Sequence, residues 1–106
     1  MQRILMLVVG TVLAVSTSSL WAEVAAMGVD LYKAKCVACH GTDGKGETPA
    51  GKGLRARDFG SVDVQKQSDT DLGYTMTKGK NKMPGFSGLS IDQVTSLVKY
   101  IRGMKK

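Results

Sequence analysis

Both cysteines of the chain and its only histidine lie in one five-residue stretch, Cys36-Val37-Ala38-Cys39-His40. Two thiols three positions apart, with an imidazole directly after the second, can serve three kinds of chemistry. They can exchange thiols and disulfides, hold a structural zinc ion together with further ligands, or attach a haem and bind its iron. The rest of the chain discriminates between these possibilities.

The first two possibilities fit the sequence poorly. A thiol–disulfide oxidoreductase places its C-x-x-C motif at the start of a helix in a βαβ unit, whereas here a helical pattern precedes the motif. A structural zinc site needs four ligands, normally including a second Cys or His pair, and the chain has no further cysteine or histidine. Covalent haem attachment, for which C-x-x-C-H is the sequence signal, is therefore favoured.

The spacing has a geometrical reason in this third case. Cys36 and Cys39 lie on one side of a helical turn, so both sulfurs can add to the two vinyl groups of one porphyrin. His40 is then carried under the ring, where a neutral imidazole nitrogen can bind the iron as proximal ligand. The stretch is predicted to carry one haem c.

The ligand on the other side of the iron must come from elsewhere in the chain. Met27, Met76 and Met104 lie on helical patterns, where hydrophobic packing explains them. Met83 lies in a glycine-rich loop, and Pro84 stiffens the backbone directly after it. We predict Met83 as the distal ligand, with Met76 in reserve. An iron with both ligands suits electron transfer and leaves no open position for oxygen, so no catalytic residues are expected.

The N-terminal residues have the layout of a secretory signal peptide. Arg3 is followed by the apolar run 4–15, and small residues allow cleavage after Ala22 or as late as Ala26. The twelve-residue run is too short for a membrane-spanning helix, which needs about 20 apolar residues. We predict a signal peptide at 1–22 and one periplasmic domain at 23–106, without stable membrane insertion after cleavage.

The predicted mature domain has 84 residues, and loss of Arg3 lowers the formal net charge from +6 to +5. A domain of this size buries only ~60% of its unfolded surface. Large apolar residues are also few, with two Phe and three Tyr. A cofactor is therefore expected to supply much of the core.

Three helical segments are predicted, and only residues 61–65 come close to a strand pattern. The first helix covers about 24–39. The second covers 69–78, between a Ser68 N-cap and Gly79. The third follows Ser90, which can form a capping box, and its apolar residues keep helical spacing to the chain end. The fold class is thus all-α, with long loops that are expected to wrap round the cofactor.

On these residues the sequence resembles the small class I c-type cytochromes, over nearly all of the predicted mature chain. Residues 28–41 are similar to the N-terminal helix of the family, with Gly28 and Tyr32 in its glycine–aromatic pattern. Residues 79–90 are similar to the distal-ligand loop. Tyr100 matches the aromatic residue that packs on the first helix near the glycine. The resemblance implies the class I cytochrome c fold, with three main helices and long loops wrapped round one haem.

The resemblance also assigns roles to single residues. It implies thioethers at Cys36 and Cys39, with His40 as proximal and Met83 as distal ligand of the haem iron. The family commonly has a proline after the attachment site, whose carbonyl oxygen accepts the histidine Nδ1–H and orients the ring. Pro49 is the candidate for that role in this chain.

Four lysines flank the expected haem site: Lys78, Lys80 and Lys82 lead to the predicted distal ligand, and Lys35 precedes Cys36. In the fold that the sequence resembles, the haem edge is exposed near these segments. The lysines are then expected to steer the protein toward an acidic patch on a redox partner. An ordinary solvated surface is the alternative. Nucleic acid is not an expected partner, because aromatic and basic residues do not interleave.

Two classes of function follow. One is a monomeric periplasmic carrier of single electrons between redox partners. The other is a haem-bearing electron-entry subunit of a larger dehydrogenase or oxidase complex. A ligand-binding or peroxide-reducing haem protein is the least favoured class, because it requires an iron without Met83.

Overall fold

The computed structural model describes residue 10 and residues 18–106, so all but one residue of the predicted apolar run, and most of the signal peptide, lie outside the described residues. The described part is all-α, as predicted, with one isolated bridge between Lys80 and Met83 and no strand. None of its helices is long and apolar enough to cross a membrane. The helices are α1 (Ser18–Lys35), α2 (Val37–His40), α3 (Pro49–Leu54), α4 (Val62–Gln65), α5 (Asp69–Lys78) and α6 (Ile91–Arg102).

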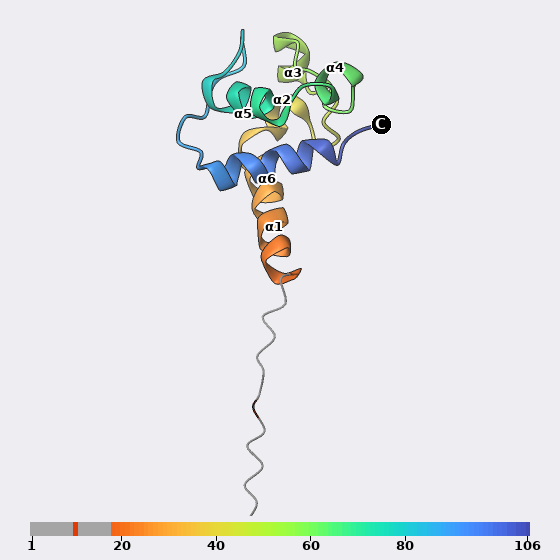
Figure 1. Cartoon of the computed structure of the whole chain (residues 1–106). Helices are drawn as coiled ribbons and strands as arrows, with labels where there is room; N and C mark the ends of the chain where they lie inside the picture. The colour runs from red at the N-terminus through yellow and green to blue at the C-terminus, as the bar shows by residue number, and fades with distance from the viewer. Residues whose placement is uncertain (1–9, 11–17) are drawn as a thin grey trace, which may run out of the picture.

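The two longest helices, α1 and α6, cross each other, and the shorter helices lie to one side of the crossing (Figure 1). At the crossing, a Cβ on Gly28 would lie 2.6 Å from the carbonyl oxygen of Ser96, so a side chain there would separate the helices. Tyr32 and Tyr100 pack with ring centroids 4.7 Å apart. The predicted packing of Tyr100 on the first helix near the glycine is confirmed.

The buried core draws on four helices and on the segment before α4. Within α6 the buried apolar residues keep helical spacing, whereas Ile91 in the first turn is 83% exposed. The core consists of Tyr32, Phe59, Val64, Leu72, Met76, Leu97, Val98 and Ile101.

The predicted starts of α5 and α6 are confirmed. Ser68 accepts a hydrogen bond from the amide of Asp71, and α5 ends before Gly79, whose φ is 78°. Ser90 and Gln93 form both hydrogen bonds of a capping box, at 2.8 and 3.2 Å. Local polar side chains therefore set the ends of these helices.

The first helix differs from its predicted range of 24–39. It begins at Ser18, and at Cys36 it gives way to the separate short helix α2. Two further short helices, α3 and α4, occupy segments that the sequence predicts as loops, including the strand-like residues 61–65. Each follows a hydroxyl N-cap, Thr48 or Ser61. A cap followed by proline, as at Thr48-Pro49, is a helix-start signal that the glycine-rich composition obscures.

Candidate haem-binding site

The C-x-x-C-H motif forms one helical turn that ends in α2. The amides of His40 and Gly41 donate to the carbonyl oxygens of Cys36 and Val37, at 2.9 and 2.8 Å. Both thiols are half-buried and unpaired. Burial, opposed by the charge of Lys35, raises the pKa of the Cys36 thiol to about 11. A thiol–disulfide oxidoreductase instead needs a cysteine whose pKa is lowered.

His40, at the end of this turn, is only 7% exposed. Its Nδ1 lies 3.1 Å from the carbonyl oxygen of Arg57. A carbonyl can only accept a hydrogen bond, so Nδ1 carries the proton. Burial lowers the pKa of His40, although this hydrogen bond opposes the shift. The ring is therefore neutral at neutral pH, and its Nε2 lone pair is available to a metal.

The prediction that Pro49 accepts this hydrogen bond is wrong, because Arg57 does so. Pro49 is instead the first residue of α3, where a missing N–H costs no helical hydrogen bond. Phe59, two residues beyond Arg57, stacks on the imidazole with ring centroids 4.0 Å apart and 19° between the planes. The segment 57–59 thus orients His40 both through a carbonyl oxygen and through a ring.

The start of α3 holds the turn that carries the thiols. The hydroxyl of Thr48 lies 2.7 Å from the carbonyl oxygen of Ala38 and 3.0 Å from that of Cys39. The same hydroxyl accepts a hydrogen bond from the amide of Gly51 at 2.9 Å. A Cβ on Gly51 would lie 2.0 Å from the Cys39 carbonyl oxygen. The Thr48 hydrogen bonds and the close approach of Gly51 fix the orientation of the motif. The motif residues themselves do not predict these contacts.

Tyr32 binds the end of the same turn. Its buried hydroxyl donates to the carbonyl oxygen of Gly41 at 2.5 Å, and burial raises its pKa. Tyr32→Phe removes this donor and leaves a buried carbonyl unpaired, which is expected to cost about 1–3 kcal/mol of the free energy of unfolding. Urea unfolding of the haem-bearing protein measures this loss.

Tyr74→Phe is the matched control, because Tyr74 lies on the surface with 64% of its area exposed. It is expected to change the free energy of unfolding by less than about 0.5 kcal/mol. Equal stability of the two variants would show that the Tyr32 hydroxyl does not support the motif.

Met83 lies in the connection between α5 and α6, in a loop fixed by its own backbone. Lys80 and Met83 exchange backbone hydrogen bonds of 3.2 and 2.9 Å. The backbone of Gly85 lies so close to Lys78 that a Cβ on the glycine would be 2.6 Å from the Lys78 carbonyl carbon. The Met83 side chain is half-buried, whereas Met76, the reserve candidate, is buried in the core cluster. Packing therefore explains Met76 better than it explains Met83.

One contact joins the attachment motif to this loop. The Lys35 ammonium lies 5.4 Å from the ring centroid of Phe86. The amide of Phe86 in turn donates to the carbonyl oxygen of Met76 at 2.8 Å. The structure thus brings the lysine before the first cysteine to the loop of Met83. Lys80 and Lys82 are exposed on the same connection, and Lys78 is exposed at the end of α5.

The donor atoms suit a haem attached by thioethers better than a bare metal ion. Within the described ranges, no group of three or more Cys, His, Asp or Glu side chains could hold a metal. The site offers two thiols on one helical turn and a neutral imidazole with an oriented ring. This is the set of groups that covalent haem attachment uses.

A family model described as cytochrome c oxidase, cbb3-type, subunit III matches residues 23–101. The chain belongs to the small class I c-type cytochromes. The cytochrome is 36% identical over 81 residues to a protein named cytochrome c6 from Limnospira maxima, covering 72% of this chain and 88% of that protein. A protein of the same name from a Picosynechococcus species is 32% identical over 100 residues. The match covers 89% of this chain and 84% of that protein.

A solved structure, the KustC0563 c-type cytochrome, has the same fold with a TM-score of 0.67. It is 36% identical, and the match covers 74% of this chain and 98% of that one. The class I cytochrome fold is therefore confirmed. As a member of this family, the cytochrome carries one covalently bound haem c, and it transfers electrons to and from redox partner proteins and is not an enzyme.

Proposed function

We propose that this cytochrome is a monomeric periplasmic carrier of single electrons, with its haem attached at Cys36 and Cys39 and its iron bound by His40 and Met83. The proposal rests on the neutral form and fixed orientation of the His40 ring. The imidazole is neutral and oriented, and its Nδ1–H is already bound by the Arg57 carbonyl. A histidine held in this way offers Nε2 to a metal with raised basicity.

The loop of Met83 supports the other half of the ligand set. A loop fixed by its own backbone can hold a thioether on the iron in both oxidation states, so little reorganisation accompanies electron transfer. His and Met together raise the reduction potential of a haem. Such an iron also has no open position for oxygen or peroxide.

Export is proposed on the pattern of residues 1–22, with the cytochrome domain at 23–106. The match to the family model begins at residue 23, directly after Ala22, which supports cleavage at that position. Both Ala22 and Ala26 are exposed on α1. Intact mass spectrometry of the protein, from a host that exports and matures c-type cytochromes, should find a chain that begins at Glu23 with one added haem. A full-length chain without haem would contradict the proposal.

The lysines on the distal loop are proposed to dock an acidic partner. Replacing Lys80 and Lys82 by glutamate is expected to slow oxidation of the reduced protein by anionic ferricyanide about tenfold at low salt. The effect should vanish in 1 M salt, where the Debye length is about 3 Å. Stopped-flow absorption measures both rates.

The control reverses equal charge away from this loop. Lys66 is the C-cap residue directly after α4 and pairs with Asp63, and Lys105 lies beyond the end of α6. The double replacement of these two lysines by glutamate changes the net charge equally. If this control slows the reaction as much as the loop variant does, only net charge matters, and the docking role is wrong.

A second candidate is supported by the description of the family model, which names an oxidase subunit. In that case the cytochrome would be the electron-entry subunit of a larger complex. Size-exclusion chromatography of the native protein separates the two. A carrier elutes at the mass of a monomer, whereas a subunit elutes together with its complex.

A further inference from the structure

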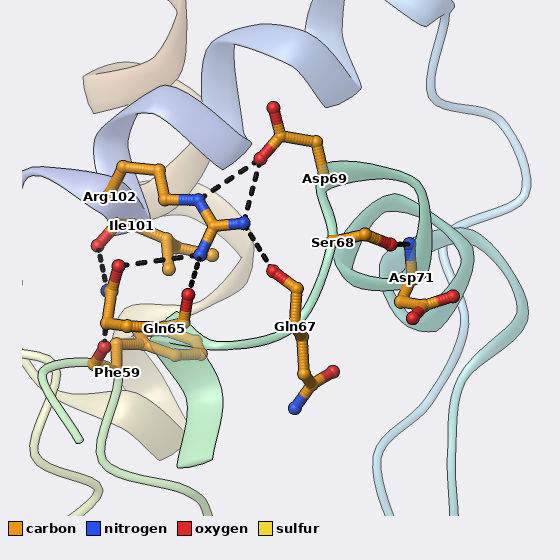
Figure 2. A network of polar contacts seen from close by, with 8 residues as sticks. All are labelled: Phe59, Gln65, Gln67, Ser68, Asp69, Asp71, Ile101 and Arg102. Carbon is orange, nitrogen blue, oxygen red and sulfur yellow. Dashed lines mark hydrogen bonds and ion pairs between the residues drawn. The ribbon is translucent and has the colours of Figure 1, made fainter. Parts of the chain in front are cut away.

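Gln65, the last residue of α4, joins two distant parts of the chain through its carboxamide. Its Nε2 lies 2.7 Å from the carbonyl oxygen of Phe59 and 2.9 Å from that of Ile101 in α6 (Figure 2). Carbonyl oxygens only accept, so the two hydrogens of the amide serve both contacts. The opposite atom, Oε1, faces the Arg102 guanidinium at 3.5 Å. This orientation gives each polar atom of the side chain a partner.

Arg102 holds the segment that carries Gln65. Its guanidinium donates to the backbone carbonyl oxygen of Gln65 at 2.7 Å and to that of Gln67 at 2.5 Å. The same group pairs with the Asp69 carboxylate through two nitrogens, at 2.8 and 3.1 Å (Figure 2). A planar guanidinium with this many partners fixes the geometry between residues 65–69 and α6.

The target of Gln65 is the segment that orients His40. Arg57 accepts the Nδ1 hydrogen bond, and the Phe59 ring stacks on the imidazole. The Phe59 amide donates to the carbonyl oxygen of Gly44 at 2.8 Å, and its carbonyl oxygen accepts from Gln65. Through these contacts Gln65 ties segment 57–59 to α6, and the ion pair between Asp58 and Lys106 ties the same segment to the residues beyond α6.

We propose that Gln65 is a positioning residue for the proximal haem ligand, and that its two hydrogen bonds help to set the reduction potential. The proposal rests on His40 binding the iron, as proposed above. A histidine ligand that donates Nδ1–H to a carbonyl is more basic, which favours the ferric state. Without Gln65, segment 57–59 loses its hydrogen bond to the α4 side chain and its link to α6, although the Asp58–Lys106 ion pair and the Phe59–Gly44 hydrogen bond remain. The Arg57 carbonyl is then held less firmly, its hydrogen bond with His40 weakens, and the reduction potential rises.

Gln65→Leu in the haem-bearing protein removes both donors at similar volume. The preference for the reduced state is expected to rise about threefold, a shift of about 28 mV at 59 mV per tenfold for one electron. Exchange of the His40 Nδ1 proton with solvent, followed by NMR of the reduced protein, should become at least about tenfold faster, because the weakened hydrogen bond opens more often. Gln65→Met, which also lacks the donors and adds no charge, replaces Gln65→Leu if that variant does not fold.

Two glutamines supply controls. Gln67→Leu makes the same change two residues away, where the amide lies 3.3 Å from the Asp63 carbonyl on the surface. Gln93→Leu removes the capping box of α6 and lowers stability without touching segment 57–59. Neither is expected to change the reduction potential or the exchange rate.

Failure of the ligation by His40 and failure of the positioning role of Gln65 give different results. A wild-type protein without a low-spin c-type spectrum would contradict the ligation by His40 itself. If the wild type shows that spectrum, but Gln65→Leu loses stability as Gln93→Leu does and keeps its potential and exchange rate, Gln65 is structural only and its positioning role is wrong.

Discussion

Met83→Ala is expected to leave the haem attached and to open the iron to added ligands. The thioethers and His40 do not depend on the distal loop, whose backbone contacts survive the substitution. Alanine has no donor atom for iron, so water or carbon monoxide can take the sixth position. Absorption spectra of the reduced variant, with and without carbon monoxide, measure the change. We expect binding in the variant and none in the wild type.

Met76→Ala is the matched control. It empties a buried site in the core cluster, which should cost about 2–5 kcal/mol of the free energy of unfolding. The iron should nevertheless remain closed to carbon monoxide. An unchanged low-spin spectrum in Met83→Ala, with an open iron in Met76→Ala, would move the distal ligand to Met76.

Gly51→Ala is expected to be among the most destabilising single substitutions in the chain. The new Cβ would lie 2.0 Å from the Cys39 carbonyl oxygen and 2.6 Å from that of Gly46, so the backbone must move. Overpacking against backbone should cost about 3 kcal/mol or more. The turn that carries the thiols must shift, so the yield of haem-bearing protein should fall as well. Thermal unfolding and the haem-to-protein ratio measure the two effects.

Gly53→Ala makes the same change two residues later in the same helix. No atom lies within 4 Å of the new Cβ, and alanine favours a helix over glycine by about 1 kcal/mol. This variant should match or exceed the stability of the wild type. If both alanine variants lose stability equally, the close contact between α2 and α3 is not the cause.

The parts of the fold that the sequence predicts are those set by neighbouring residues. The ends of α5 and α6 follow from Ser68, Gly79 and the Ser90 capping box, each within a few positions of the helix that it ends. The sequence does not predict the short helices α3 and α4, since four to six residues carry too little periodicity. Only their N-caps mark them.

In the candidate site, too, the sequence predicts what depends on neighbouring residues and not what depends on contacts between distant segments. The motif residues Cys36, Cys39 and His40 follow from spacing alone, because helical geometry dictates which side chains share a side. The acceptor at Arg57 could not be predicted, because a backbone carbonyl has no sequence signature and lies 17 positions from its histidine. The stacking of Phe59 and its link to Gln65 likewise depend on how distant segments fold together.

The most direct test of the account is the absorption spectrum of the purified cytochrome, oxidised and reduced, with and without carbon monoxide. A haem bound by His40 and Met83 predicts a low-spin c-type spectrum, with the weak near-infrared band of methionine-bound ferric iron and no response to carbon monoxide. A high-spin spectrum that shifts with carbon monoxide would show an open sixth position and would contradict the electron carrier proposed here.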